Sequence, residues 1–528
     1  MLTLLLYMGC AMSRGWLFRV VLFGLCLALS LWQTDFSAVV LWERGGRFIS
    51  MTGEMFPPDV TFFRQILETL RDTLCTSLAG TGLGAVLGAV GTLLCNSYVN
   101  RRKGMRIFLK TVVHVFRCIP VLILALLCTF LFGLGVWAGV VAITISTGAV
   151  LARLGYEDSE SSDLETTYVL EYTGAGRVKA WLSSVWNQIF PGYLSNVLYI
   201  LESNVRNAAI LGFVGAGGIG LLLNEKLAWR EYSKVGAILC ALYIVVSACE
   251  FMSEYLRKKI LYENRGGKIT FLPFFLLFFP ALLLLFIWNP LSGEMNLAAF
   301  TSIIKGVVSP DITILFSLQG DDVPALLLET LCIAFLGTVG GTLFALFFSV
   351  FACFRFFGKT AFFMRMLLLA FRAVPVLVFG LLWIRVTGPG PFAGVLTLAL
   401  CSVGFLAKRF LIAIDAIDLH PYQALRASGV TVLPAVRWGI VPQILPHYVS
   451  AILYRLDINL RETAVLGLVG AGGIGTTLFL AMNHYEWNQA GAMLWGLVLL
   501  VAIIGLFSEG FRKEYRRRIE GERKGNAD

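Results

Sequence analysis

Long apolar runs separated by short polar stretches dominate the chain. A run of about 20 apolar residues is long enough to cross a bilayer as a helix, which satisfies its own backbone hydrogen bonds there. The pattern predicts an all-α polytopic membrane protein with about 12 transmembrane helices, six in each half of the sequence. The runs lie near 16–33, 77–95, 113–134, 135–152, 192–222 and 236–256, and near 270–288, 327–353, 366–386, 391–408, 447–478 and 490–510.

The amino-acid composition supports an integral membrane protein. Of the 528 residues, 57% are hydrophobic and only 14% are charged, whereas a soluble protein carries about 25% charged residues. The mean hydropathy is +0.78. The 53 glycines agree with this class, since glycine is more frequent in transmembrane helices than in soluble ones.

Basic residues cluster just beyond the ends of the apolar runs, and the chain has a net charge of +10. Cytoplasmic loops of membrane proteins carry such an excess of Lys and Arg, so the clusters indicate topology and not nucleic-acid binding. We expect both termini in the cytoplasm, and loops 34–63 and 289–326 on the outer side. Whether residues 1–11 belong to the mature chain stays open, because Met12 is also an ordinary cytoplasmic start. The basic clusters are 100–106, 257–268, 354–365 and 512–524.

Cysteine and histidine show no pattern typical of a metal site or a disulfide framework. The 11 cysteines are scattered singly, without a C-x-x-C pair, and the four histidines lack metal-ligand spacing. Buried thiols acting as small hydrophobic side chains account for the cysteines. We therefore expect neither a metal nor another cofactor.

The two halves of the sequence are copies of one another. At an offset of 255 residues, twelve of the seventeen positions from Asn204 to Gly220 are identical to those from Asn459 to Gly475. The units are expected at 1–262 and 263–528. Because each unit has an even number of spans, both enter the membrane in the same direction, as a parallel repeat about an axis along the membrane normal.

The six-letter stretch GAGGIG occurs twice, at 215–220 and 470–475. Its glycines have the spacing of a dinucleotide site, but that site needs a preceding strand, and here an apolar membrane run precedes it. Glycines instead allow close backbone approach or a helix break, so we expect either a gate in the pathway or tight helix packing. The residues concerned are Gly215, Gly217, Gly218 and Gly220, and Gly470, Gly472, Gly473 and Gly475.

Charged residues occur inside the fifth span of both halves. An acid lies four residues before an arginine in each copy, which is the favourable order for an ion pair within a helix. Charges within a membrane span are costly and usually face a watery cavity, so these side chains are candidates for lining the translocation pathway. A structural pair that neutralises itself is the alternative. The candidates are Glu202, Asn204 and Arg206, and Asp457, Asn459 and Arg461.

A long cytoplasmic stretch follows the fourth span of each half, at 153–191 and 408–446. In the second copy, Pro421 suits a helix start and Gly429 a helix stop, so a short surface helix is expected between them. This stretch resembles the E-A-A-x-x-x-G…P loop of ABC importer permeases. The resemblance implies contact with an ATPase through Gln423, Ala424, Leu425, Gly429, Pro442 and Pro446, and through Gly174 and Pro191 of the first copy.

The loop, the Asn-x-Arg pattern and GAGGIG together resemble the phosphonate subgroup of these permeases, in both halves of the chain. The resemblance implies the type I ABC importer permease fold, with two permease units fused in tandem. It also implies a homodimeric ATPase subunit, an extracytoplasmic solute-binding protein and a location in the bacterial inner membrane. The implied solute is phosphonate or a related oxyanion such as phosphite.

The first copy of the loop departs from this pattern. Tyr168-Val169-Leu170-Glu171 stands where the second copy has Gln-Ala-Leu-Arg, and the residues before it, 157–160, are acidic. Gly174 is retained at the same offset. We predict that the two loops couple unequally to the ATPase.

Two other functions remain as alternatives. An ABC importer for an amino acid or an organosulfur compound shares this type of loop. A 12-span secondary transporter would need no ATPase, and the loop argues against it. ATP hydrolysis within the chain is excluded, because Gly358-Lys359-Thr360 matches the end of a P-loop but Cys353 stands where its first glycine is required.

Overall fold

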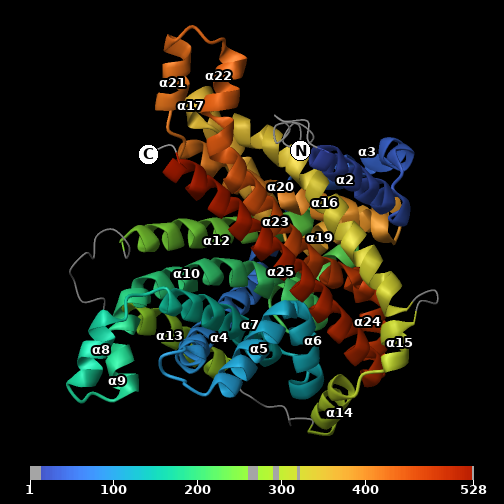
Figure 1. Ribbon diagram of the computed structural model, residues 1–528. Helices are drawn as coiled ribbons and strands as arrows, with labels where there is room; N and C mark the ends of the chain where they lie inside the picture. The colour runs from blue at the N-terminus through green and yellow to red at the C-terminus, as the bar shows by residue number, and fades with distance from the viewer. Residues whose placement is uncertain (1–13, 260–271, 289–296, 318–321, 526–528) are drawn as a thin grey trace. The chain divides into compact units, whose positions relative to one another are not determined.

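The computed structural model describes residues 14–259, 272–288, 297–317 and 322–525, and this part of the chain is helical without a strand (Figure 1). Within these residues, eight helices are long and apolar enough to cross a membrane, and up to twelve spans result when each bent helix pair counts as one span. The helical membrane fold predicted from the sequence is confirmed. The open question about residues 1–11 lies outside the described residues.

The helices pack into two compact units, which are described separately. One unit comprises Ser50–Lys305 and the other comprises Met1–Ile49 with Gly306–Asp528. Of the described residues, 14–49 therefore pack with the second half of the sequence, and 272–288 and 297–305 pack with the first half. The division of the sequence at 262/263 stays a prediction about the repeat.

The unit of residues 50–305 contains one pair of closely packed long helices, α4 and α7. Glycines of α4 make the approach possible: a Cβ on Gly80, Gly84 or Gly88 would lie 2.7 Å from a side chain of α7. Small residues one turn apart allow helix backbones to meet in this way. The elements are η1 (Val60–Phe62), α4 (Phe63–Cys95), α5 (Lys103–Cys118), α6 (Val121–Phe132), α7 (Val136–Glu160), α8 (Glu165–Tyr172), α9 (Arg177–Ser183), α10 (Val185–Leu211), η2 (Gly212–Val214), α11 (Ile219–Ala228), α12 (Tyr232–Lys258), α13 (Leu272–Trp288) and α14 (Leu297–Val308).

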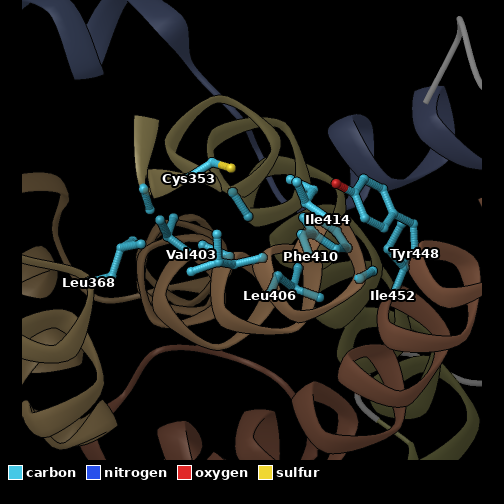
Figure 2. Packing of buried hydrophobic residues seen from close by; sticks show 13 residues of the cluster. Cys353, Leu368, Val403, Leu406, Phe410, Ile414, Tyr448 and Ile452 are labelled. Carbon is cyan, nitrogen blue, oxygen red and sulfur yellow. The ribbon is translucent and has the colours of Figure 1, made fainter. Parts of the chain in front are cut away.

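The second unit is built around α16, α20 and α23. Figure 2 shows its core, in which the rings of Phe410 and Tyr448 stack at 4.1 Å between centroids. The elements are α2 (Arg14–Gln33), α3 (Ala38–Gly53), α15 (Ile312–Phe316), α16 (Val323–Phe351), α17 (Phe354–Phe357), α18 (Thr360–Ala373), α19 (Val376–Thr387), α20 (Pro391–Asp415), α21 (His420–Ala427), α22 (Val432–Gly439), α23 (Val441–Leu466), η4 (Gly467–Val469), α24 (Ile474–Asn483) and α25 (Trp487–Gly525).

In the described part of the chain, three runs expected as single spans are bent pairs of helices. The run 447–478 is divided between α23 and α24 at 51°, and the other two bend more sharply. The run 113–134 is divided between α5 and α6 at 95°, and the run 366–386 between α18 and α19 at 85°. Pro120 and Pro375 lie at the breaks. Proline has no backbone N–H and forces the residue before it into an extended conformation, which ends the helix at that point.

Several expected boundaries also shift. The stretch 34–63, expected as an outer loop, contains α3, and the expected loop 289–326 contains α14 and α15. The fifth spans begin earlier than expected, so that Pro191 and Pro446 lie inside α10 and α23 and not in the preceding loops. Both prolines lie beyond the first turn of their helix, so each removes one backbone hydrogen bond from it.

Candidate functional site

Each unit carries a short helical hairpin between its long helices. In the first half α8 and α9 form it, and in the second half α21 and α22. Each helix of the second hairpin begins 255 residues after its counterpart in the first. Figure 1 shows the pair α21 and α22 standing out from its bundle. The first loop thus folds like the second although its sequence departs, because Gly174 and Gly429 both turn the chain, with φ of 95° and 84°.

The second hairpin presents the residues expected to contact an ATPase. Gln423 and Ala424 are exposed and Leu425 is half-buried. The hairpin closes over Gly439, where a Cβ would lie 2.8 Å from the Cα of Tyr422. The predicted surface helix from Pro421 to Gly429 is therefore present, and its contact with an ATPase stays a prediction, as for the exposed Pro442.

The two hairpins differ in charge and in attachment. Glu171 of α8 accepts hydrogen bonds from the Tyr98 hydroxyl at 2.6 Å and from Arg177 Nε at 2.9 Å. The hydrogen bond from Tyr98, and next that from Arg177, lowers the pKa of Glu171. At the equivalent position Arg426 donates to the Val430 carbonyl at 2.9 Å, within its own hairpin. The first hairpin is thus bound to the turn after α4.

The base of the second hairpin is closed by an amide and a carboxylate. Gln443 Nε2 donates to the Asp418 carbonyl at 2.8 Å, and the Asp418 backbone N–H donates to Gln443 Oε1 at 3.0 Å. The Asp418 side chain accepts the backbone N–H of His420 at 3.0 Å. That hydrogen bond lowers the pKa of Asp418. These contacts join the start of α21 to the start of α23.

The two asparagines expected in the pathway are structural junctions within each bundle. Asn204 Nδ2 lies 2.8 Å from both Thr81 Oγ1 and Thr147 Oγ1, and so joins α10 to α4 and α7. Asn459 Nδ2 makes the equivalent bonds to Thr338 at 2.8 Å and to Ser402 at 3.0 Å. Both asparagines are buried. Buried amides with satisfied donors fix the register of the three helices.

The charged pairs lie on a different face of the same helices. Arg206 Nη1 is 3.0 Å from Glu202 Oε1, and Arg461 Nη2 is 2.9 Å from Asp457 Oδ2. Residues two apart on a helix are separated by about 200°, so these pairs do not share a side with the asparagines. Asp457 Oδ1 is buried without a hydrogen-bond partner in the described part of the chain. The pathway role of all six residues stays a prediction.

The glycine loops are reverse turns held in place by α4 and α16. Gly215, Gly217 and Gly218 have φ of 75–80°, and their counterparts Gly470, Gly472 and Gly473 have φ of 76–82°. The Ile219 backbone N–H donates to Thr73 Oγ1 at 2.8 Å, and that of Ile474 to Thr330 Oγ1 at 2.9 Å. In both copies the turn ends the fifth helix and starts the next.

Close packing accounts for the last glycine of each loop. A Cβ on Gly220 would lie 2.1 Å from the Ala209 carbonyl oxygen, and one on Gly475 would lie 2.0 Å from that of Ala464. The geometry provides the close backbone approach and the helix break that the sequence favoured. A gating function of these loops stays a prediction.

A duplicated ion pair was missed by the sequence reasoning. Lys110 Nζ of α5 lies 2.7 Å from Glu160 Oε1, the last residue of α7. At the same offset of 255 residues, Arg365 Nη2 of α18 lies 3.4 Å from Asp415 Oδ2, the last residue of α20. Each ion pair links the end of the helix that precedes a hairpin to the first helix of a bent pair. The repeat could have revealed this ion pair, because the offset of 255 residues aligns Lys110 with Arg365 and Glu160 with Asp415.

A further pair was also missed and occurs in the second half only. Arg455 Nη2 lies 2.8 Å from Glu462 Oε2 on α23. The first half has Ile200 and Asn207 at these positions. The sequence carried a signal for this pair, because Arg455 and Glu462 are charged where the first half has uncharged residues.

Comparison with known proteins identifies the family. The model of the binding-protein-dependent transport system inner membrane component matches residues 80–262 and again 337–521. The chain belongs to this family. It is a multi-pass inner-membrane permease subunit of an ABC importer, a transport subunit and not an enzyme, with the family domain present twice in tandem.

Several curated relatives of this permease are similar in sequence. A phosphate-import permease protein PhnE of Mycolicibacterium smegmatis is 27% identical over 494 residues, which cover 92% of each chain. A phosphite transport system permease protein PtxC of Stutzerimonas stutzeri is 36% identical over 29% of this chain and 55% of its own. A putative cryptic phosphonate transport system permease protein PhnE2 of Escherichia coli is 34% identical over 23% of this chain and 98% of its own.

Proposed function

We propose that this permease imports a phosphorus oxyanion, a phosphonate or a related anion such as phosphite or phosphate. The observation that carries the proposal is that a relative over 92% of the chain is a phosphate-import permease. Relatives over shorter segments are named for phosphite and phosphonate. All three solutes share a tetrahedral, negatively charged PO₃ group, which guanidinium groups bind well.

The proposed importer needs two partner proteins. An extracytoplasmic binding protein delivers the anion to the outer face, and a homodimeric ATPase binds the two hairpins on the cytoplasmic face, where both termini of the permease lie. The same fold of α8–α9 and α21–α22 at a fixed offset supports one docking position on each half, and the different charges of the two hairpins favour unequal coupling. Nucleotide binding and release then move the hairpins, and the two repeats rock against one another.

The duplicated ion pair suggests how this movement reaches the membrane. Glu160 and Asp415 end the helices that lead into the hairpins, and their partners Lys110 and Arg365 lie on α5 and α18. A displaced hairpin would therefore pull on the first arm of each bent pair. The second arms, α6 and α19, lie beyond the breaks at Pro120 and Pro375.

Reconstitution in liposomes with both partners tests the proposal. We expect ATP-dependent uptake of methylphosphonate, phosphite or phosphate, with competition among these anions and none from methionine or taurine. Uptake of methionine or taurine instead would support the importer of another solute. Uptake by the purified chain without an ATPase would support a secondary transporter and refute the proposal.

A further inference from the structure

A buried arginine with a partly exposed counter-ion distinguishes the second half. The Arg455 side chain is 3% exposed, whereas that of Glu462 is 26% exposed. Arg455 Nε donates to Ser402 Oγ at 3.0 Å, and its guanidinium lies 4.8 Å from the centroid of the Phe405 ring. Residues seven apart on a helix are separated by about 10 Å along its axis, so both side chains extend toward one another to meet.

The bundle does not need this ion pair in order to fold. The first half forms the same three-helix junction around Asn204 with Ile200 and Asn207 in place of the pair. A buried ion pair is also a weak source of stability, because removing two charges from water costs about as much as their attraction returns. Its presence in one copy therefore calls for a functional explanation, as for most charges within a membrane span.

A second guanidinium lies at the same aromatic ring. Arg372 of α18 is 5.4 Å from the centroid of Phe405 and is buried. Gly404 makes room for it, since a Cβ there would lie 2.7 Å from Arg372 Cγ. The first half has an arginine at the equivalent position 117, but Val150 replaces the ring and Ala149 the glycine. At these described positions, the second half thus brings two arginines to one aromatic side chain and the first half does not.

We propose that Arg455 and Arg372 form a binding site for the transported oxyanion within the second repeat, and that Glu462 occupies Arg455 until the anion arrives. This proposal rests on the proposed function and assigns its substrate site. The PO₃ group enters from the exposed side, where Glu462 lies, and replaces its carboxylate on the guanidinium. Two guanidiniums match the charge and the oxygen geometry of such an anion better than one. The displaced carboxylate then returns to Arg455 when the anion leaves.

Uptake kinetics of variants in the complete reconstituted transporter test the site. Arg455→Lys keeps a charge but loses the fork of donors, and we expect its KM for phosphate and methylphosphonate to rise about tenfold or more. Glu462→Gln removes the competing carboxylate, and we expect its KM to fall severalfold. Glu157→Gln is the matched control, because Glu157 pairs with Arg153 at 2.7 Å on the surface of α7. Its KM should equal that of the unmodified protein.

The exchanged variant R455E/E462R separates binding from architecture. It can re-form the ion pair, so restored uptake with an unchanged KM would show a purely structural role and overturn the proposal. A lost or strongly weakened uptake, with normal abundance and thermal stability, supports the proposal. If the arginine variants do not fold, Glu462→Gln decides alone, since an unchanged or raised KM contradicts the proposed competition. Failure of the unmodified transporter to import any phosphorus oxyanion would instead refute the proposed function.

Discussion

Reversal of one charge in the duplicated ion pair should uncouple ATP hydrolysis from transport. Lys110 Nζ and Glu160 Oε1 are 2.7 Å apart, with side chains 28% and 34% exposed. A partly exposed pair of this kind contributes about 0.2–1 kcal/mol to the free energy of unfolding. Lys110→Glu turns this attraction into a repulsion of similar size, so the total loss is about 0.4–2 kcal/mol. That loss is too small to unfold a bundle of this size.

The functional effect should be larger than the effect on stability. If the pair transmits movement of the first hairpin to α5, Lys110→Glu will keep much of its ATPase activity and lose most of its transport. Both activities are measured in proteoliposomes that contain the complete transporter. The exchanged variant K110E/E160K restores the attraction and should restore transport.

Two controls make this prediction specific. Glu157→Lys reverses a charge one turn earlier on α7, in a pair with Arg153 that lies on a single helix. It should leave the ratio of transport to ATP hydrolysis unchanged. The reasoning is refuted if Glu157→Lys uncouples as strongly as Lys110→Glu, or if the exchanged variant transports no better than the single variant.

Four further outcomes are expected. Gly174→Asp and Gly429→Asp should reduce the stimulation of the ATPase unequally, and equal losses would contradict unequal coupling. Asn204→Ala leaves two buried threonine hydroxyls without their donor, so the free energy of unfolding should fall by about 1–3 kcal/mol, measured by thermal unfolding in detergent. Gly475→Ala places a Cβ 2.0 Å from a carbonyl oxygen and should destabilise by about 1–3 kcal/mol or more, which unchanged thermal unfolding would refute. Because hydrogen bonding lowers the pKa of Glu171 from 4.5, its stabilisation of the first hairpin should be complete above that pH and decrease as the pH falls through the lowered pKa; amide hydrogen exchange of α8 measures this.

The repeat made much of the local structure predictable. The offset of 255 residues placed Gly174 opposite Gly429, and the two hairpins begin and end their turns accordingly. Hydrophobic run length indicated the spans, since a bilayer requires about 20 apolar residues per helix. The bends after α5 and α18 were not predicted, although Pro120 and Pro375 stand at both breaks. Run length alone does not distinguish one straight helix from two bent ones.

The contacts of the candidate site residues were likewise predictable only in part. Sequence spacing predicted the ion pairs of Glu202 with Arg206 and of Asp457 with Arg461, because residues four apart are neighbours on any helix. Sequence spacing did not predict that Asn204 and Asn459 join neighbouring helices, on a different face from those ion pairs. Their hydrogen bonds go to threonines and a serine more than 50 residues away.

By itself, the sequence determined the class of the protein, its two-fold repetition and the short-range pairs on single helices. These follow from composition, run length and helical periodicity, which are local properties. Only the tertiary structure decided that residues 14–49 pack with the second half, and that Lys110 contacts Glu160. Such contacts depend on how separate helices pack side by side, and no spacing along one helix specifies that.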